Sequence, residues 1–144
     1  RIKRLAVPIV LSLAAGAVTS IVSAVGILSL FGAPADILAS IAPRATTTPV
    51  AMAIAQQLGG VPALAACIVL FAGIVGAMAA TPLLNAMKFD DYRPRGFALG
   101  VSAHGFGAAR AFQVSETAGA FASLGMALNA VMTAALLSLL AALL

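Results

Sequence analysis

The chain has 144 residues, of which 62% are hydrophobic and only 8% are charged, and its formal net charge is +4. An ordinary soluble domain is about 45–50% apolar and about 25% charged, so this composition excludes a soluble enzyme. It predicts instead an all-α integral membrane protein that crosses a lipid bilayer several times.

Three uncharged apolar segments are each long enough to cross the membrane as a helix: residues 5–31, 60–87 and 117–144. A bilayer core about 30 Å thick needs about 20 apolar residues in a helix. A cleavable signal peptide could imitate the first segment, but its apolar stretch is much longer than the roughly 7–15 residues of a signal h-region. The sequence therefore predicts three full transmembrane helices.

The basic residues gather in two clusters, which are Arg1, Lys3 and Arg4 before the first span, and Lys88, Arg93 and Arg95 after the second. Short basic loops mark the cytoplasmic side of a membrane protein. We therefore expect the N-terminus and the 88–95 loop in the cytoplasm. This placement beside the spans also argues against binding of nucleic acid.

Two cytoplasmic clusters require an even number of crossings between them, and the first two spans supply two. The segment 34–58 must then enter and leave the membrane on one side, as a re-entrant hairpin of two short helices. The alternative is a single kinked span, which would place the second basic cluster outside the cell.

The prolines of this segment indicate where its helices begin and end. Pro34 can open the first helix and Pro43 can close it, while Thr48 and Pro49 suit the N-cap and the first position of the second helix. The expected break covers residues 44–48.

Residues 96–116 repeat the arrangement from the cytoplasmic side, with an expected break at Gly105, Phe106 and Gly107. Glycine lets the backbone turn where other residues would clash. The result is three spans and two oppositely oriented hairpins that meet near the midplane. Secondary transporters built from inverted repeats use this arrangement.

Both breaks carry polar residues, and the substrate-binding candidates are Arg44, Thr46, Thr47 and Thr48 at the first break and Ser102, His104, Gly105, Gly107 and Arg110 at the second. Helix N-termini favour anions, and an arginine offers a fork of donors that matches a carboxylate. We therefore expect one shared site for a small carboxylate, formed by both breaks.

Structural roles are the alternative for several of these residues. Arg44 and Arg110 could extend to the membrane interfaces, and His104 could simply hydrogen-bond a carbonyl. Cys67 has no partner cysteine, so no disulfide or cysteine metal site is expected. The acidic residues form no convincing catalytic pair, so we expect neither a catalytic residue nor a cofactor.

Four stretches resemble the LrgB/CidB family, and the resemblance covers most of the chain from about Pro43 onward. They are the runs 43–52, which reads PRATTTPVAM, 57–62, which reads QLGGVP, 95–111, which begins RGFALG and ends ARA, and 115–121, which reads SETAGAF. Members often have a small or aliphatic residue where this chain has Phe106 and a threonine where it has Ala108. These departures bear on the size of the substrate.

The resemblance implies a bacterial cytoplasmic (inner) membrane location and further N-terminal spans, so residues 1–144 would be a single transmembrane domain from the C-terminal portion of a longer protein. Members were first named as holin-like or antiholin-like regulators of murein hydrolase activity and cell lysis. Relatives include the plastidal glycolate/glycerate translocator, and some members are associated with pyruvate uptake. A homodimer and a small LrgA/CidA-type membrane partner are also implied.

The function expected from the sequence is transport of small 2-hydroxy or 2-oxo monocarboxylates of the glycolate, glycerate and pyruvate type. The alternative is a holin-like or antiholin-like regulator of murein hydrolase export and cell lysis.

Overall fold

The computed structural model describes residues 2–143, and over these residues the chain forms six α-helices. They are α1 (Ile2–Leu30), α2 (Ala35–Ile41), α3 (Thr48–Gln57), α4 (Pro62–Ala86), α5 (Tyr92–Val114) and α6 (Glu116–Leu143). Arg1 and Leu144, the outermost residues of the first basic cluster and of the third expected span, lie outside the described residues.

The three long apolar helices expected from the sequence are confirmed as α1, α4 and α6. Their apolar stretches cover Ala6–Leu30, Pro62–Ala86 and Glu116–Ala142, each long enough to cross a membrane. α6 begins one residue earlier than expected, because Glu116 stands in its first turn, where the helix dipole favours a negative charge.

Large apolar side chains cover the outer faces of α1 and α4. Those more than 60% exposed include Val7, Leu11, Val22, Phe71 and Met78. A soluble monomer rarely exposes so many large apolar side chains, whereas a lipid environment favours them.

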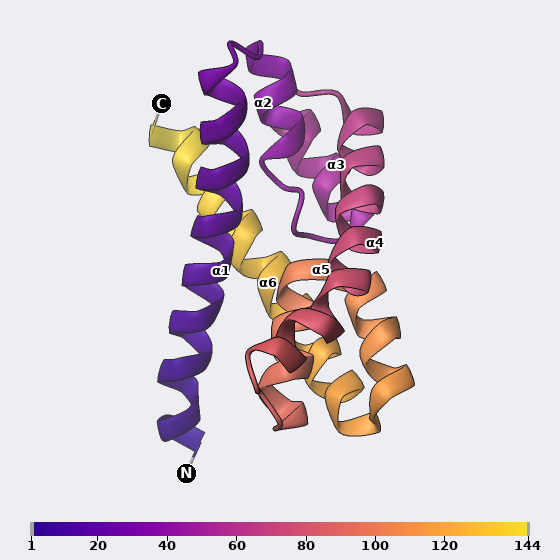
Figure 1. Ribbon diagram of the computed structural model, residues 1–144. Helices are drawn as coiled ribbons and strands as arrows, with labels where there is room; N and C mark the ends of the chain where they lie inside the picture. Colours follow the sequence, from indigo (N-terminus) through magenta and orange to yellow (C-terminus); the bar gives the residue numbers. More distant parts are fainter. Residues whose placement is uncertain (1, 144) are drawn as a thin grey trace.

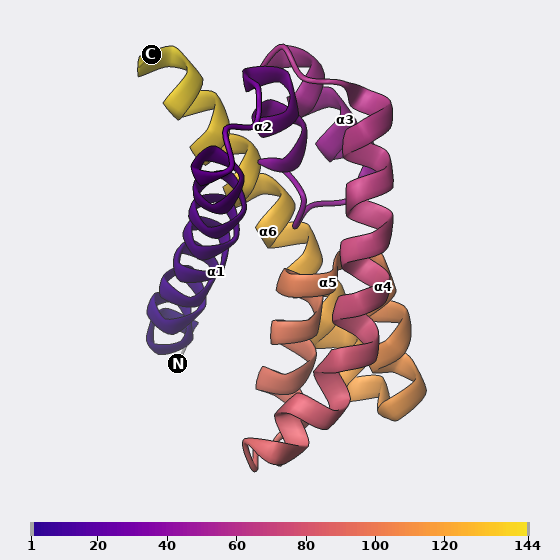
Figure 2. The ribbon, with the colours of Figure 1, turned by 45° about the horizontal axis from the view of Figure 1, so that its top comes forward.

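α2 and α3 are two short helices joined by a turn, and they lie between α1 and α4. α1 rises to the upper end of the molecule, α2 turns back, and α3 returns to that end before the chain enters α4 (Figure 1). The turn between them, residues 42–47, lies near the middle of the molecule in both Figure 1 and Figure 2.

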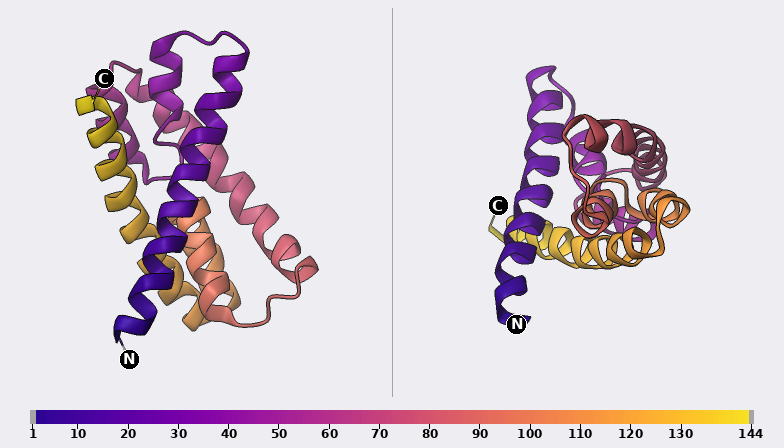
Figure 3. Two further views of the ribbon diagram at one scale, coloured as in Figure 1. Left: turned by 90° about the vertical axis from the view of Figure 1, so that its left-hand side faces the viewer. Right: turned by 60° about the horizontal axis from the view of Figure 1, so that its bottom comes forward.

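α5 consists of two antiparallel halves, because Ala103 and His104 leave the helical conformation. The first half rises from the lower end and the second half returns to it, so the break in α5 approaches the turn at 42–47 from the opposite side (Figures 1 and 2). The α4–α5 connection lies at the same end as the start of α1, which runs along one side of the bundle (Figure 3).

The closest helix packing in the molecule joins α5 to α6. A methyl group at Gly96 would overlap with the carbonyl of Ala118, and one at Gly100 would overlap with the carbonyl of Ala122. Small residues four apart let two helix backbones approach closely in lipid. This contact fixes the first half of α5 against α6.

We expect single cysteines introduced by Ala33→Cys and Asp90→Cys, each in a Cys67→Ala background, to react with a membrane-impermeant thiol reagent from opposite sides of the membrane. Ala33 belongs to the α1–α2 connection and Asp90 to the α4–α5 connection, and these two connections lie at opposite ends of the molecule (Figure 1). The measurement is labelling of intact and of permeabilised cells. Labelling of both cysteines from one side would contradict the arrangement.

Candidate functional site between two helix breaks

The first break is a compact turn between α2 and α3. Pro43 and Thr46 are buried, and Thr46 Oγ1 donates a hydrogen bond to the Pro43 carbonyl at 2.8 Å. Thr47 is the N-cap of α3, so the expected N-cap at Thr48 is wrong by one residue. α3 accommodates Pro49 in its first turn, where a missing N–H costs little.

The second break lies at Ala103 and His104, so its expected position at residues 105–107 is wrong. His104 has φ 39° and ψ −126°, an uncommon conformation for a residue with a side chain. Gly107 serves packing instead of turning, because a methyl group there would overlap with the carbonyl of Leu99 in the first half of α5.

His104 points toward α4. Its side chain is only 3% exposed, and its Nε2 lies 3.1 Å from the Val69 carbonyl oxygen, which can only accept a hydrogen bond. A Cβ at Gly73 would overlap with the imidazole, so the absence of a side chain at Gly73 makes room for the ring. The Phe106 ring meets the imidazole edge-on at a centroid distance of 6.1 Å.

Asn129 of α6 joins the two breaks. Its side chain is 1% exposed, and its Nδ2 donates to the Ala45 carbonyl at 2.8 Å and to the Val101 carbonyl at 3.1 Å. Ala45 lies in the first break, and Val101 lies two residues before the second. The amide thus supplies hydrogen bonds to backbone groups near both interruptions, which is the condition for irregular backbone at membrane depth.

A cavity of about 430 Å³ lies beside these contacts. α1 forms one wall, and the first break and the end of the first half of α5 form the others. The residues around it are Ala15, Gly16, Thr19, Ser20, Ser23, Arg44, Ala45, Val101 and Ser102.

Arg44 supplies the cavity with its charged group. Its Nη2 donates to Ser23 Oγ at 3.4 Å, a long and weak hydrogen bond. Its Nε is buried and has no hydrogen-bond partner among the described residues. The guanidinium therefore has one N–H without an acceptor among the described residues, and protein atoms cover this N–H.

The structure brings two of the expected site residues to this cavity, Arg44 and Ser102. Ser102 Oγ donates to the Ala98 carbonyl of its own helix at 2.7 Å. Arg110 does not line the cavity, and its Nη1 donates to Gln113 Oε1 at 3.0 Å. Gly105 is exposed, and no neighbouring atom would meet a Cβ placed on it.

The sequence analysis missed the contribution of α1. Gly16, Ser20 and Ser23 are four and three residues apart, so they share the face of α1 that borders the cavity. A methyl group at Gly16 would come within 2.9 Å of Val101 Cγ1 in α5. Polar and small residues at helical spacing in an otherwise apolar span are the signal that could have identified this face.

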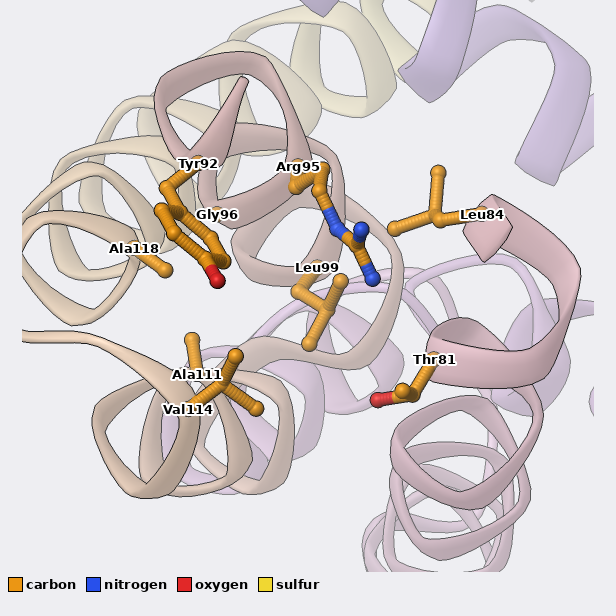
Figure 4. A pocket seen from close by; sticks show the side chains of 9 residues that line it. All are labelled: Thr81, Leu84, Tyr92, Arg95, Gly96, Leu99, Ala111, Val114 and Ala118. Carbon is orange, nitrogen blue, oxygen red and sulfur yellow. The ribbon is translucent and has the colours of Figure 1, made fainter. Parts of the chain in front are cut away.

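A second, much smaller cavity of about 10 Å³ is lined by residues of α4, α5 and α6 (Figure 4). Arg95 borders it, but its guanidinium already donates to Asn85 Oδ1 at 2.6 Å and to the Phe89 carbonyl at 2.9 Å. This space has room for about one water molecule, and none of the expected binding residues borders it.

Within residues 2–143, no group of three or more His, Cys, Asp and Glu side chains could hold a metal ion.

The sequence pattern of the LrgB-like family matches residues 1–143. The chain belongs to the LrgB-like family. The resemblance noted from its motifs is thereby confirmed, and with its three long apolar helices the chain is a membrane protein of this family.

Individual relatives agree with this assignment. The chain is 34% identical over 132 residues to the uncharacterized protein YwbG of Bacillus subtilis (strain 168), covering 92% of this chain and 59% of that protein. It is 31% identical over 140 residues to the holin-like protein CidB of Staphylococcus epidermidis (strain ATCC 12228 / FDA PCI 1200), covering 97% of this chain and 61% of that protein.

A third relative is the holin-like protein CidB of Staphylococcus aureus (strain N315), which is 30% identical over 113 residues, covering 78% of this chain and 49% of that protein. The LrgB-like chain thus spans about half to three-fifths of the length of these relatives. No solved structure matches it.

We expect Asn129→Leu to lower the free energy of unfolding by at most about 2–6 kcal/mol, because it takes the donor from the carbonyls of two half-buried residues, and a fully buried group would lose about 1–3 kcal/mol. Reversible unfolding in mixed detergent micelles measures the loss. The matched control is Asn85→Leu, since Asn85 is exposed and bonds a surface arginine. Equal losses in the two variants would show that Asn129 does not stabilise the breaks.

Proposed function

We propose that this chain is the membrane-embedded part of a holin-like protein that regulates murein hydrolase export and cell lysis. The support comes from its membership of the LrgB-like family and from relatives named holin-like protein CidB. Because the chain spans only part of those relatives, the activity of the whole protein belongs to the proposal.

A second candidate function is transport of small 2-hydroxy or 2-oxo monocarboxylates. The observation that favours it is the cavity of about 430 Å³ with the incompletely bonded guanidinium of Arg44 on its wall. A guanidinium can hold both oxygens of a carboxylate, so the cavity offers the chemistry that such a substrate needs.

In this proposal the chain lies in the bacterial cytoplasmic membrane, with the N-terminus and the 88–95 loop in the cytoplasm. The positive-inside rule supports this orientation, and the start of α1 and the α4–α5 connection do lie at one end of the molecule. α2–α3 and α5 are then re-entrant hairpins of opposite orientation in an inverted-repeat plan. α3 has 10 residues and is thus about 15 Å long, which is half of the bilayer core.

The proposed binding residues fall into two groups. Arg44 and Ser102 border the cavity, whereas Thr46 and Thr47 lie in the first break and Thr48 begins α3. His104, Gly105, Gly107 and Arg110 remain proposed from their place at the second break. A homodimer and an LrgA/CidA-type membrane partner are also part of the proposal.

We expect the purified chain in liposomes to release an entrapped dye, with a rate that rises with protein density and does not saturate with added acid. Release of this kind follows from a holin-like activity. The opposite result is that the dye stays inside while the uptake rate of radiolabelled glycolate, glycerate or pyruvate saturates with acid concentration. That result would contradict the holin-like activity and favour transport.

A substitution of Arg44 tests whether the cavity takes part in acid uptake or in dye release. Arg44→Lys keeps the charge but loses the fork, so it should impair acid uptake and leave dye release unchanged. The matched control is Arg93→Lys. The Arg93 side chain is 66% exposed, and its Nε lies 3.5 Å from Oδ1 of Asp91, which belongs to the α4–α5 connection.

We expect the losses of glycolate affinity in Arg44→Ala and Arg110→Ala to add within about 0.5 kcal/mol, as they do for independent positions. The reason is that Arg44 borders the cavity, whereas Arg110 bonds Gln113 and does not border it. A double-mutant cycle on equilibrium binding measures the coupling. Strong non-additivity would instead favour the shared carboxylate site expected from the sequence.

A further inference from the structure

Ser20 belongs to the cavity wall, but in the rotamer that the structure holds its hydroxyl is covered by protein atoms. It borders the cavity together with Arg44, and its Oγ is buried without a hydrogen-bond partner among the described residues. A buried polar group without a partner costs free energy, and native proteins contain few of them. Arg44 Nε is in the same condition at the same cavity.

The other serines of α1 with a described side-chain hydrogen bond do not share this feature. Ser12 Oγ donates to the Ile9 carbonyl at 2.9 Å, Ser23 Oγ to the Ser20 carbonyl at 3.3 Å, and Ser29 Oγ to the Val25 carbonyl at 2.7 Å. Each of them satisfies its hydroxyl on its own helix. Ser20 therefore differs from these serines in its bonding, and it borders the same cavity as Arg44.

We propose that Ser20 is a specificity-determining residue, which recognises a polar group on the carbon next to the carboxylate that Arg44 holds. This inference rests on the second candidate function, since it takes the cavity as a carboxylate site. A serine hydroxyl can donate and accept, so it matches a hydroxyl on that carbon in either sense. Rotation about χ1 moves Oγ between staggered positions without moving α1.

Arg44 and Ser20 are placed so that they can contact different groups of one ligand. Arg44 comes from the first break and Ser20 from α1, so the two groups approach the ligand from different walls. Ser23 follows Ser20 on the same face of α1 and already contacts Arg44 Nη2, which places the hydroxyl face and the guanidinium side by side. An acid without the neighbouring hydroxyl would keep the Arg44 contact and leave Ser20 unpaired.

The test compares glycolate with acetate, because the two acids differ by this hydroxyl. Equilibrium dialysis of the purified full chain in detergent, with each radiolabelled acid, gives the two affinities. We expect the unmodified chain to bind glycolate about tenfold more tightly than acetate, which is at the upper end of the net contribution of one hydrogen bond. Ser20→Ala and the more nearly isosteric Ser20→Cys should bring the ratio within about twofold by weakening glycolate alone.

The matched control is Ser12→Ala, which removes an exposed serine of the same helix and should leave the ratio unchanged. Acetate binding reports whether each variant keeps the site intact. An unchanged glycolate preference in both Ser20 variants, or an equal loss of both acids, would overturn the role of Ser20 while carboxylate binding stands. Absence of binding of either acid to the unmodified chain would overturn the carboxylate site itself, and Ser20 recognition with it.

Discussion

The buried amide of Asn129 determines how the two interrupted helices meet. A membrane-embedded chain can leave the helical conformation only where another group replaces the lost hydrogen bonds. One Nδ2 group reaches the carbonyl of Ala45 in the first break and that of Val101 near the second. The arrangement of the two breaks, and with it the cavity beside them, therefore depends on a single side chain of α6.

The sequence predicts the first break well because proline restricts the backbone directly. Pro43 lies near the start of the turn at 42–47 and Pro49 in the first turn of α3, and the structure departs from the expected boundaries by only one or two residues. The expected position of the second break is wrong because glycine can serve either a turn or a close contact between helices. Gly107 permits close approach to the Leu99 carbonyl, whereas His104 makes the turn with help from contacts on α4. Such contacts between distant segments are absent from a local sequence pattern.

The same limitation applies to the site. Arg44 could be selected from the sequence, because a charge beside a helix break is conspicuous in an apolar chain. Asn129 cannot be selected from the sequence, since nothing local links position 129 to position 45. Ser20 and Ser23 were not selected, because they lie in an unbroken span and face the cavity only once α1 packs beside the breaks. Tertiary neighbours, and not residue type, distinguish these side chains from Ser12 or Ser29.

The contacts around the cavity differ in strength in a way that separates its framework from its binding surface. The bonds of Asn129 are of ordinary length and belong to a side chain that is 1% exposed, so a ligand in the cavity would leave them in place. The contact of Arg44 with Ser23 is 3.4 Å long, and Arg44 Nε is unpaired. A carboxylate offers the guanidinium a stronger, charge-assisted partner than a serine hydroxyl. It could therefore replace Ser23 without disturbing the amide that joins the two breaks.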